Sequence, residues 1–240
     1  ILVADVDPLA ASRAMLDAAV CGDCPERRSL GGKCYVSLHQ APLSTWKAHQ
    51  RDPDNNRRAV ERAIDTGRPL RIGSYGDPTA IPVEVWLGLV ARWEAGGGVT
   101  RTGYTHQWRK DFAQPFRAIL MASTQGADDT RAANDLGWRA FMMEDDTGEV
   151  ATRRDLECLS ESRGKSCADC GLCNGARDGR KLVNIHIAPH GALAGRGIRP
   201  AGMVVVIPSR DAWRTLRSRK ASVIMATAMS MMPTISTSTS

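Results

Sequence analysis

The seven cysteines of this 240-residue chain fall into two short segments. Residues 21–34 hold three of them with the spacing C-x2-C-x9-C, and residues 158–173 hold four with the spacing C-x8-C-x2-C-x2-C. Thiolates are soft ligands that select zinc ions and iron–sulfur clusters. The sequence therefore predicts two metal centres, the first on Cys21, Cys24 and Cys34 and the second on Cys158, Cys167, Cys170 and Cys173.

The two groups differ in the number of ligands that they offer. Three thiolates leave one position open, which in a zinc site marks catalysis and on a four-iron cluster leaves one iron free for a substrate or cofactor. Four thiolates complete either a structural zinc site or a fully ligated cluster. Spacing does not separate iron from zinc, and a zinc ion in the first group could instead be completed by His39, by Asp23 or by a residue upstream of Ile1.

Composition narrows the class of protein. The chain is 42% hydrophobic and 24% charged, and it contains no apolar run long enough for a membrane span. Its first residues do not show the basic region followed by an apolar region that is typical of a signal peptide, so we expect none. We therefore expect a cytoplasmic protein without membrane contact, in a compartment that keeps thiols reduced. The net charge of +6 leaves nucleic acid as a candidate partner. Neither the substrate nor the oligomeric state follows from these numbers.

Short apolar runs alternate with amphipathic stretches along the chain, as in a parallel sheet wound with helices. This pattern predicts an α/β fold, namely a partial (β/α) barrel of about six parallel strands with helices outside and cysteine-rich metal-binding loops. The strands are expected at residues 1–4, 69–75, 100–106, 116–123, 138–143 and 182–188.

Helices are expected between these strands. Residues 82–95 form the clearest one, because Pro82 suits a first helical turn and Val85, Leu89 and Trp93 recur four residues apart. Two further stretches are expected to be helical, residues 127–137 and residues 44–65, the second of them broken at Pro53.

We expect residues 1–200 to form one domain that carries both metal loops. Residues 201–220 would add a strand and a basic helix, and residues 221–240, which hold no charge, would be a disordered or artefactual tail. The chain opens at Ile1 inside an expected strand, so we also expect that residues are missing upstream.

Polar side chains gather where the expected strands end, which is where parallel α/β folds carry their chemistry. Ser and Asp are common turn residues, but Tyr, His and Gln are not, so "YTHQW" at 104–108 is poorly explained by local structure. Asp77 would orient an amine or hydroxyl, and His106 would move a proton. The candidate catalytic residues are Asp77, Tyr104, His106, Gln107 and Ser123, and the candidate cofactor-binding residues are Ser74, Tyr75, Gly76 and Trp108.

Several motifs together carry a resemblance. They are "CGDCP", "GGKCYV", "RIGSYGDPTAIPVEVW", "TGYTHQW", "MAST", "LGWRAF" and "CADCGLCNGA". Their order is similar to that of an uncharacterised family of bacteriophage and plasmid proteins, over residues 1 to about 191. The resemblance implies a phage origin and the cytoplasm of a bacterial host, and it brings no activity with it.

A weaker similarity links the layout to radical S-adenosylmethionine enzymes. It is carried by six strand–helix units, a three-cysteine loop that ends in "CY", and a four-cysteine group near the C-terminal end. The usual signature of those enzymes is C-x3-C-x2-C, from which this spacing departs, and "GSYGDP" at 73–78 is the nearest counterpart of their glycine-rich segment. The similarity implies an iron–sulfur cluster on the first group, an auxiliary cluster on the second, and S-adenosylmethionine as a cofactor.

Three functions are therefore expected in order of preference. The first is a radical S-adenosylmethionine-like enzyme of unknown substrate. The second is a zinc-bearing, nucleic-acid-modifying enzyme of barrel fold in which Asp77 is a nucleophile. The third is a non-enzymatic binding module that both metal sites only stabilise.

Overall fold

The computed structural model describes residues 1–3, 5–32, 34–176, 182–188 and 206–207. Its centre is a six-stranded sheet in which every pairing is parallel. In spatial order the strands are β2 (Leu70–Ile72), β3 (Arg101–Thr105), β4 (Met121–Gln125), β5 (Ala140–Met143), β7 (Ile185–Ile187) and β6 (Leu156–Glu157). The predicted parallel α/β class is confirmed, and among the described strands β2 and β6 form the edges of the sheet.

The first expected strand is not part of this sheet. β1 (Leu2–Val3) pairs with β8 (Val206–Ile207) instead, and β6 supplies the sixth strand. The reason lies at the carboxyl end of β2, where the Ile1 nitrogen donates a hydrogen bond to the Tyr75 carbonyl oxygen. Gly76 has a positive φ of 76°, and a Cβ there would lie 3.0 Å from the Ile1 Cβ. β1 therefore meets the end of β2 and does not run beside it.

The strand expected at 116–123 begins later than predicted. A 3-10 helix, η3 (Asp111–Ala118), occupies the start of that stretch, and β4 begins at Met121. Pro115 inside η3 has no backbone N–H to give to a neighbouring strand, so an extended ladder is disfavoured there. Phe116 is 3% exposed and packs into the core. Its apolar side chain made the sequence of this stretch resemble that of a strand.

The expected helices are present near their predicted positions. Pro53 divides the stretch expected at 44–65 into α3 (Ala41–Arg51) and α4 (Pro53–Asp65). The Asp52 carboxylate caps α4 by accepting a hydrogen bond from the Asp54 N–H. The two others are α5 (Val83–Ala95) and α6 (Gly126–Asp135). Shorter helices complete the described chain: α1 (Pro8–Arg13), α2 (Ala18–Cys21), η1 (Arg28–Leu30), η2 (Pro78–Ala80), α7 (Leu159–Arg163) and α8 (Cys167–Cys170).

Alternation along the strands gives the sheet two different faces. Tyr104 is in register with Met121, and Phe141 is in register with both Ser123 and Ile185, so these five side chains share one face. α6 packs against β4 and β5 on the opposite face, where the hydroxyls of Thr124 and Thr130 are 2.8 Å apart. The second cysteine segment covers the first face, since Cys173 packs against Met121 and Ile185.

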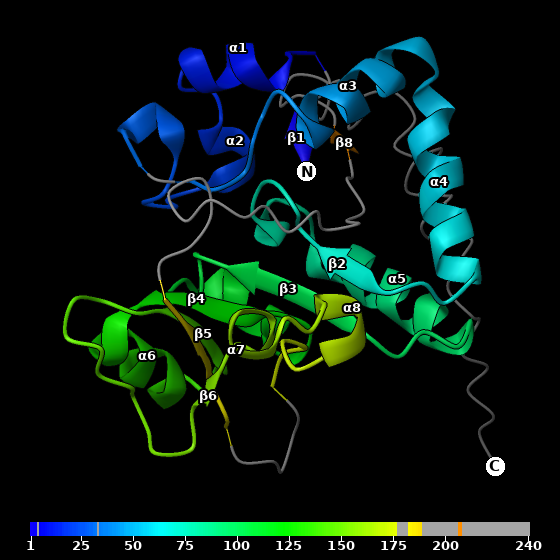
Figure 1. Cartoon of the computed structure of the whole chain (residues 1–240). Helices are drawn as coiled ribbons and strands as arrows, with labels where there is room; N and C mark the ends of the chain where they lie inside the picture. Colours follow the sequence, from blue (N-terminus) through cyan, green and yellow to red (C-terminus); the bar gives the residue numbers. More distant parts are fainter. Residues whose placement is uncertain (4, 33, 177–181, 189–205, 208–240) are drawn as a thin grey trace, which may run out of the picture.

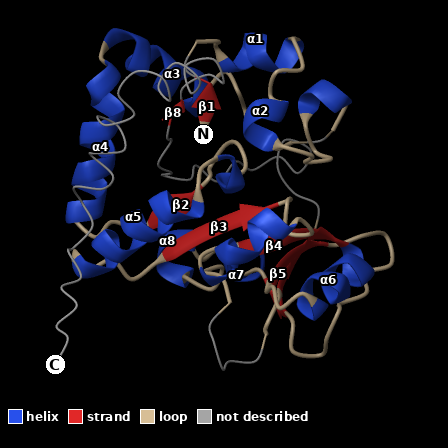
Figure 2. Ribbon diagram, turned by 180° about the vertical axis from the view of Figure 1, so that it is seen from behind, coloured by secondary structure: helices blue, strands red, loops and turns tan. Residues whose placement is uncertain are grey.

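The helices α1, α2 and α3 form a separate layer, and α4 runs from that layer down one side of the sheet (Figure 1). The view from behind shows the same two levels (Figure 2). The first cysteine segment belongs to the helical layer, where it runs from the end of α2 through η1 to Cys34. The two cysteine segments thus belong to different levels of the molecule.

Tryptophans are among the largest fully buried side chains of the core. Trp86, Trp93 and Trp138 are each at most 1% exposed, and Trp46 packs against the same cluster. No helix in the described ranges has the length and apolar character that crossing a membrane requires. β8 lies within residues 201–220, and the basic helix expected there and residues 221–240 lie outside the described residues.

Trp138→Ala should lower the free energy of unfolding by about 3–5 kcal/mol, since it removes a fully buried ring. It also removes the indole N–H that donates to the Gln114 Oε1 at 3.0 Å. Urea unfolding followed by circular dichroism measures the change. Leu87→Ala is the matched control on an exposed position of α5 and should cost below about 1 kcal/mol. Equal losses in the two variants would contradict the assigned core.

Candidate functional site

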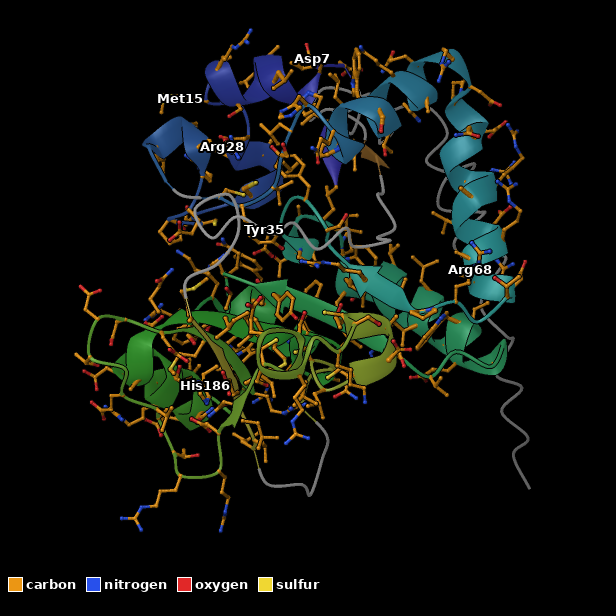
Figure 3. The ribbon with its side chains drawn as sticks, viewed as in Figure 1. Asp7, Met15, Arg28, Tyr35, Arg68 and His186 are labelled. Atoms are coloured by element: carbon orange, nitrogen blue, oxygen red, sulfur yellow. The ribbon has the colours of Figure 1, made fainter. Side chains whose placement is uncertain are left out.

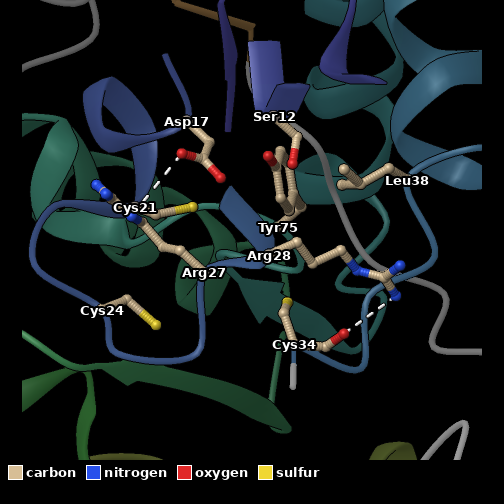
Figure 4. Close-up of a pocket in the computed structure, with 9 residues that line it drawn as sticks. All are labelled: Ser12, Asp17, Cys21, Cys24, Arg27, Arg28, Cys34, Leu38 and Tyr75. Atoms are coloured by element: carbon tan, nitrogen blue, oxygen red, sulfur yellow. Dashed lines mark hydrogen bonds and ion pairs between the residues drawn. The ribbon is translucent and has the colours of Figure 1, made fainter. Parts of the chain in front are cut away.

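The three cysteines of the first group line one small pocket (Figure 4). Its volume is about 30 Å³, comparable to one water molecule. No other cysteine lines it. The remaining lining residues are Ser12, Asp17, Arg27, Arg28, Leu38 and Tyr75.

Local backbone chemistry brings the three thiols together. α2 ends at Cys21, and the Cys24 N–H donates to the Cys21 carbonyl oxygen at 3.3 Å, which forms a tight turn. The Cys34 N–H then donates to the Glu26 carbonyl oxygen at 2.9 Å. A Cβ at Gly32 would lie 2.4 Å from the Glu26 carbonyl carbon, so only glycine allows this return of the chain.

Asp17 is a pocket residue that the sequence analysis missed. It is 3% exposed, accepts a 2.7 Å hydrogen bond from the Ser29 hydroxyl, and lies 3.8 Å from the Arg27 Nε. Arg27 also donates from Nη1 to the Gly22 carbonyl oxygen at 2.9 Å, so this ion pair closes the loop on itself. The signal was available, because Asp17 precedes Cys21 by four residues, which is about one helical turn.

The two residues considered as a fourth zinc ligand are elsewhere. The Asp23 side chain is 76% exposed and pairs with the Lys110 Nζ at 2.9 Å. His39 is exposed, and its ring lies 3.3 Å from the Ser37 hydroxyl. Neither lines the pocket, so the carboxylate at the first cysteine group is Asp17.

The pocket strongly favours neutral thiols. Burial raises the pKa of Cys21 to about 12, and negative charge on Cys24 and Cys34 raises it as well. Burial raises the pKa of Cys24 to about 12 and also raises that of Cys34. Tyr75 is hydrogen-bonded to Cys21, and burial raises the pKa of its hydroxyl too. A bound cation would reverse this preference, because it stabilises the thiolates and releases their protons.

The second cysteine group packs on the sheet around Tyr104. The Tyr104 hydroxyl is hydrogen-bonded to Cys173, which is 8% exposed, and the Tyr104 ring lies 4.7 Å from that of Phe141. Burial raises the pKa of Cys173 to about 12, and the charges of the other three cysteines raise it further. Cys158 is tied to the sheet by its N–H, which donates to the His186 carbonyl oxygen at 2.8 Å.

All seven cysteines are free thiols. In the ranges that the structure describes, no three His, Cys, Asp or Glu side chains are already arranged as a site for a metal ion. The residues nevertheless fit a soft metal in their chemistry, since each group consists of free thiols. Binding would therefore require the sulfurs to be drawn closer together.

Asp77 has a fully engaged carboxylate. Its Oδ1 accepts from the Thr79 N–H at 3.1 Å and the Thr79 hydroxyl at 2.8 Å. The Thr105 hydroxyl lies 2.8 Å from Oδ1, and the His106 N–H donates to Oδ2 at 2.8 Å. At 6% exposure, this side chain joins η2 to the end of β3. Its lone pairs are largely used in holding the fold.

The neighbouring candidates from "YTHQW" separate from one another. The Gln107 side-chain amide donates to the Cys21 carbonyl oxygen at 3.3 Å, so Gln107 supports the first cysteine loop. Trp108 is 1% exposed and donates to the Ser123 carbonyl oxygen at 3.1 Å, which makes it a core residue outside the pocket lining. Tyr104 and Ser123 share the face that carries the second group. The candidate residues therefore divide between the two cysteine groups.

The segment after β2 contributes one residue to the pocket. Tyr75 lines it, whereas Ser74 is half-buried in the turn and Gly76 is packed against Ile1. Of the four candidate cofactor-binding residues, Tyr75 is thus the one that lies beside the cysteines. The sequence analysis did not single out Tyr35 and Arg71, whose side chains are in contact. Tyr35 lies where the helical layer faces the sheet (Figure 3).

Comparison of the chain with models of protein families, with curated proteins and with solved structures finds no match.

Asp77→Asn should lower the free energy of unfolding by about 1–3 kcal/mol, because its amide group would face donors that need an acceptor. Thermal and urea unfolding measure the loss. Asp128→Asn is the matched control, with a side chain that is 97% exposed, and should change stability by about 0.5 kcal/mol or less. An Asp77→Asn variant of unchanged stability would show that the carboxylate does not hold η2 to β3.

His106 should make the protein less stable at mildly acidic pH. Burial lowers its pKa, against the opposing charges of Asp77, Glu26 and Asp129. The unfolded chain then binds the proton more readily, so stability is present above about pH 6.5 and is lost as pH falls below it. Urea unfolding at about pH 7.5 and 5.5, with a chelator present, should show a smaller loss in His106→Gln than in the unaltered protein. Equal losses would contradict the burial of this ring.

Proposed function

We propose that the protein is a metal–thiolate enzyme whose reactive centre is bound by Cys21, Cys24 and Cys34. The observation that carries this proposal is the convergence of three thiols on one pocket beside the carboxyl end of β2. In parallel α/β folds this end of the sheet is where substrates and cofactors bind. Three thiols without a fourth favour a centre with an open position.

The second group fits a different task. Cys158, Cys167, Cys170 and Cys173 offer four thiols, and Cys173 is buried among apolar residues of the sheet. A closed site of this kind stabilises its segment and has no position left for a substrate. We therefore assign the second group to structure or to electron transfer, and the first group to chemistry.

The similarity in layout to radical S-adenosylmethionine enzymes favours an iron–sulfur centre over zinc, with S-adenosylmethionine as the cofactor and the open sheet as a partial barrel. A cluster bound by the first group would supply one-electron chemistry at its open iron. The residues of this chain hold the loop in place. Gln107 supports Cys21 through its carbonyl oxygen, Tyr75 is hydrogen-bonded to the Cys21 thiol, and Arg28 donates to the Cys34 carbonyl oxygen at 3.1 Å.

A nucleic-acid-modifying enzyme with Asp77 as the nucleophile is less well supported. A nucleophilic carboxylate needs an exposed lone pair near its substrate. The Asp77 carboxylate is buried and accepts hydrogen bonds from Thr79, Thr105 and the His106 backbone. The net charge of +6 alone does not argue for nucleic acid.

Anaerobic reconstitution tests the proposal. The protein, incubated with ferrous iron and sulfide, should bind about four irons per cluster and absorb near about 400 nm, because thiolate-bound clusters absorb there. S-adenosylmethionine should perturb the spectrum. Cys21→Ser/Cys24→Ser/Cys34→Ser should lose about half of the iron and the entire S-adenosylmethionine response, since the four-cysteine centre remains.

The matched control replaces Cys158, Cys167 and Cys170 with serine and leaves the first group intact. This variant should retain the response to S-adenosylmethionine. Stoichiometric zinc without iron or sulfide in the unaltered protein would overturn the iron–sulfur proposal and favour a zinc-stabilised module.

A further inference from the structure

Arg71 lies on β2 between the two cysteine groups. Its register partner is Thr102, two residues before Tyr104, so Arg71 and Tyr104 project from the same face of the sheet. Its guanidinium carbon lies 5.9 Å from the ring centroids of both Tyr104 and Tyr35. The Arg71 Nη2 donates a hydrogen bond to the hydroxyl of Tyr35, which is the residue that follows Cys34 in the chain. Tyr35 itself stands where the N-terminal layer faces the sheet (Figure 3).

The positive charge of Arg71 is poorly compensated by the described part of the chain. None of the ion pairs between described residues includes it, and its Nε is buried without a hydrogen-bond partner. Burying a charge or a donor without a partner costs free energy. A negatively charged group bound beside this guanidinium would offset the cost of burying its charge.

Tyr104 links Arg71 to the second cysteine centre, because its ring contacts Arg71 and packs in the same apolar cluster as Cys173 and Cys158. Burial lowers the pKa of the Arg71 guanidinium, but Tyr35, Tyr104 and the Cys167 thiol raise it, and the net change is upward. Tyr104 is in turn hydrogen-bonded to Cys173. Arg71 is thus linked to Cys173 through the Tyr104 ring, and the charge of Cys167 also acts on its guanidinium.

We propose that Arg71 is the counter-charge of a metal centre bound by Cys158, Cys167, Cys170 and Cys173. The inference rests on the proposed function, because it requires that the four thiols bind a metal. Four thiolates around one divalent ion carry a net charge of about −2, which a nearby cation stabilises. Arg71 is a positioning residue that acts from outside the ligand set, with Tyr35 fixing its orientation and Tyr104 donating to a ligand sulfur.

Titration with cobalt(II) alone tests this role, because cobalt–thiolate absorption reports binding without any assay of activity. The experiment uses the full chain with Cys21, Cys24 and Cys34 replaced by serine, so that only the second group binds. In this background Arg71→Met should weaken cobalt binding by about 10–100-fold, the usual effect of losing a partner outside the ligand set. Arg71→Lys keeps the charge and should recover most of the affinity.

Two further variants separate charge from folding. Arg57→Met removes an exposed arginine of α4 and should leave the affinity unchanged. Tyr35→Phe keeps the charge but frees Nη2, so it should weaken binding by a few-fold even if Arg71→Met does not fold. Equal cobalt affinity in the parent, Arg71→Met and Tyr35→Phe would overturn the inference, as would a loss in Arg71→Lys as large as that in Arg71→Met. Failure of the parent to bind cobalt would instead overturn the four-cysteine centre itself.

Discussion

The Asp77 carboxylate is the interaction on which the arrangement of the site depends. It accepts hydrogen bonds from η2 and from the end of β3, while its own N–H donates to the Val20 carbonyl oxygen at 2.6 Å. Val20 belongs to α2, which ends at Cys21. One buried side chain and its own backbone therefore hold the N-terminal layer, the end of β2 and the end of β3 in a single position. A buried carboxylate can do this because each of its oxygens accepts two donors.

Strand β3 carries this constraint to both cysteine groups. Its alternation turns Tyr104 toward Cys173 and Thr105 toward Asp77, and Gln107 beyond the strand end holds the Cys21 carbonyl oxygen. A change in the position of β3 would therefore act on both groups together. Because a strand in the middle of a sheet is held on both sides, it is a rigid support for two sites.

Two buried arginines handle charge in opposite ways. Arg27 lies against the Asp17 carboxylate and closes the first loop, so its charge is balanced within the protein. Arg71 contacts the rings of Tyr35 and Tyr104, and none of the ion pairs between described residues includes it. A metal with four thiolates would supply the missing negative charge. This difference distinguishes a structural ion pair from a charge positioned for a ligand.

The sequence by itself determined the parallel α/β class, the positions of α4 and α5, and the two cysteine segments. These features depend on local periodicity, on Pro53 and on the spacing of cysteines within short loops. All of these are determined by residues that are close together in the sequence. The tertiary structure alone decided that β1 leaves the main sheet, that Asp77 is a buried structural acceptor, and that Asp17 and Arg71 stand beside the cysteines. Each of these depends on contacts between residues far apart in the chain, such as Ile1 with Tyr75 and Asp77 with Thr105. Such contacts leave no periodic signal, because they arise only when separate elements pack against one another.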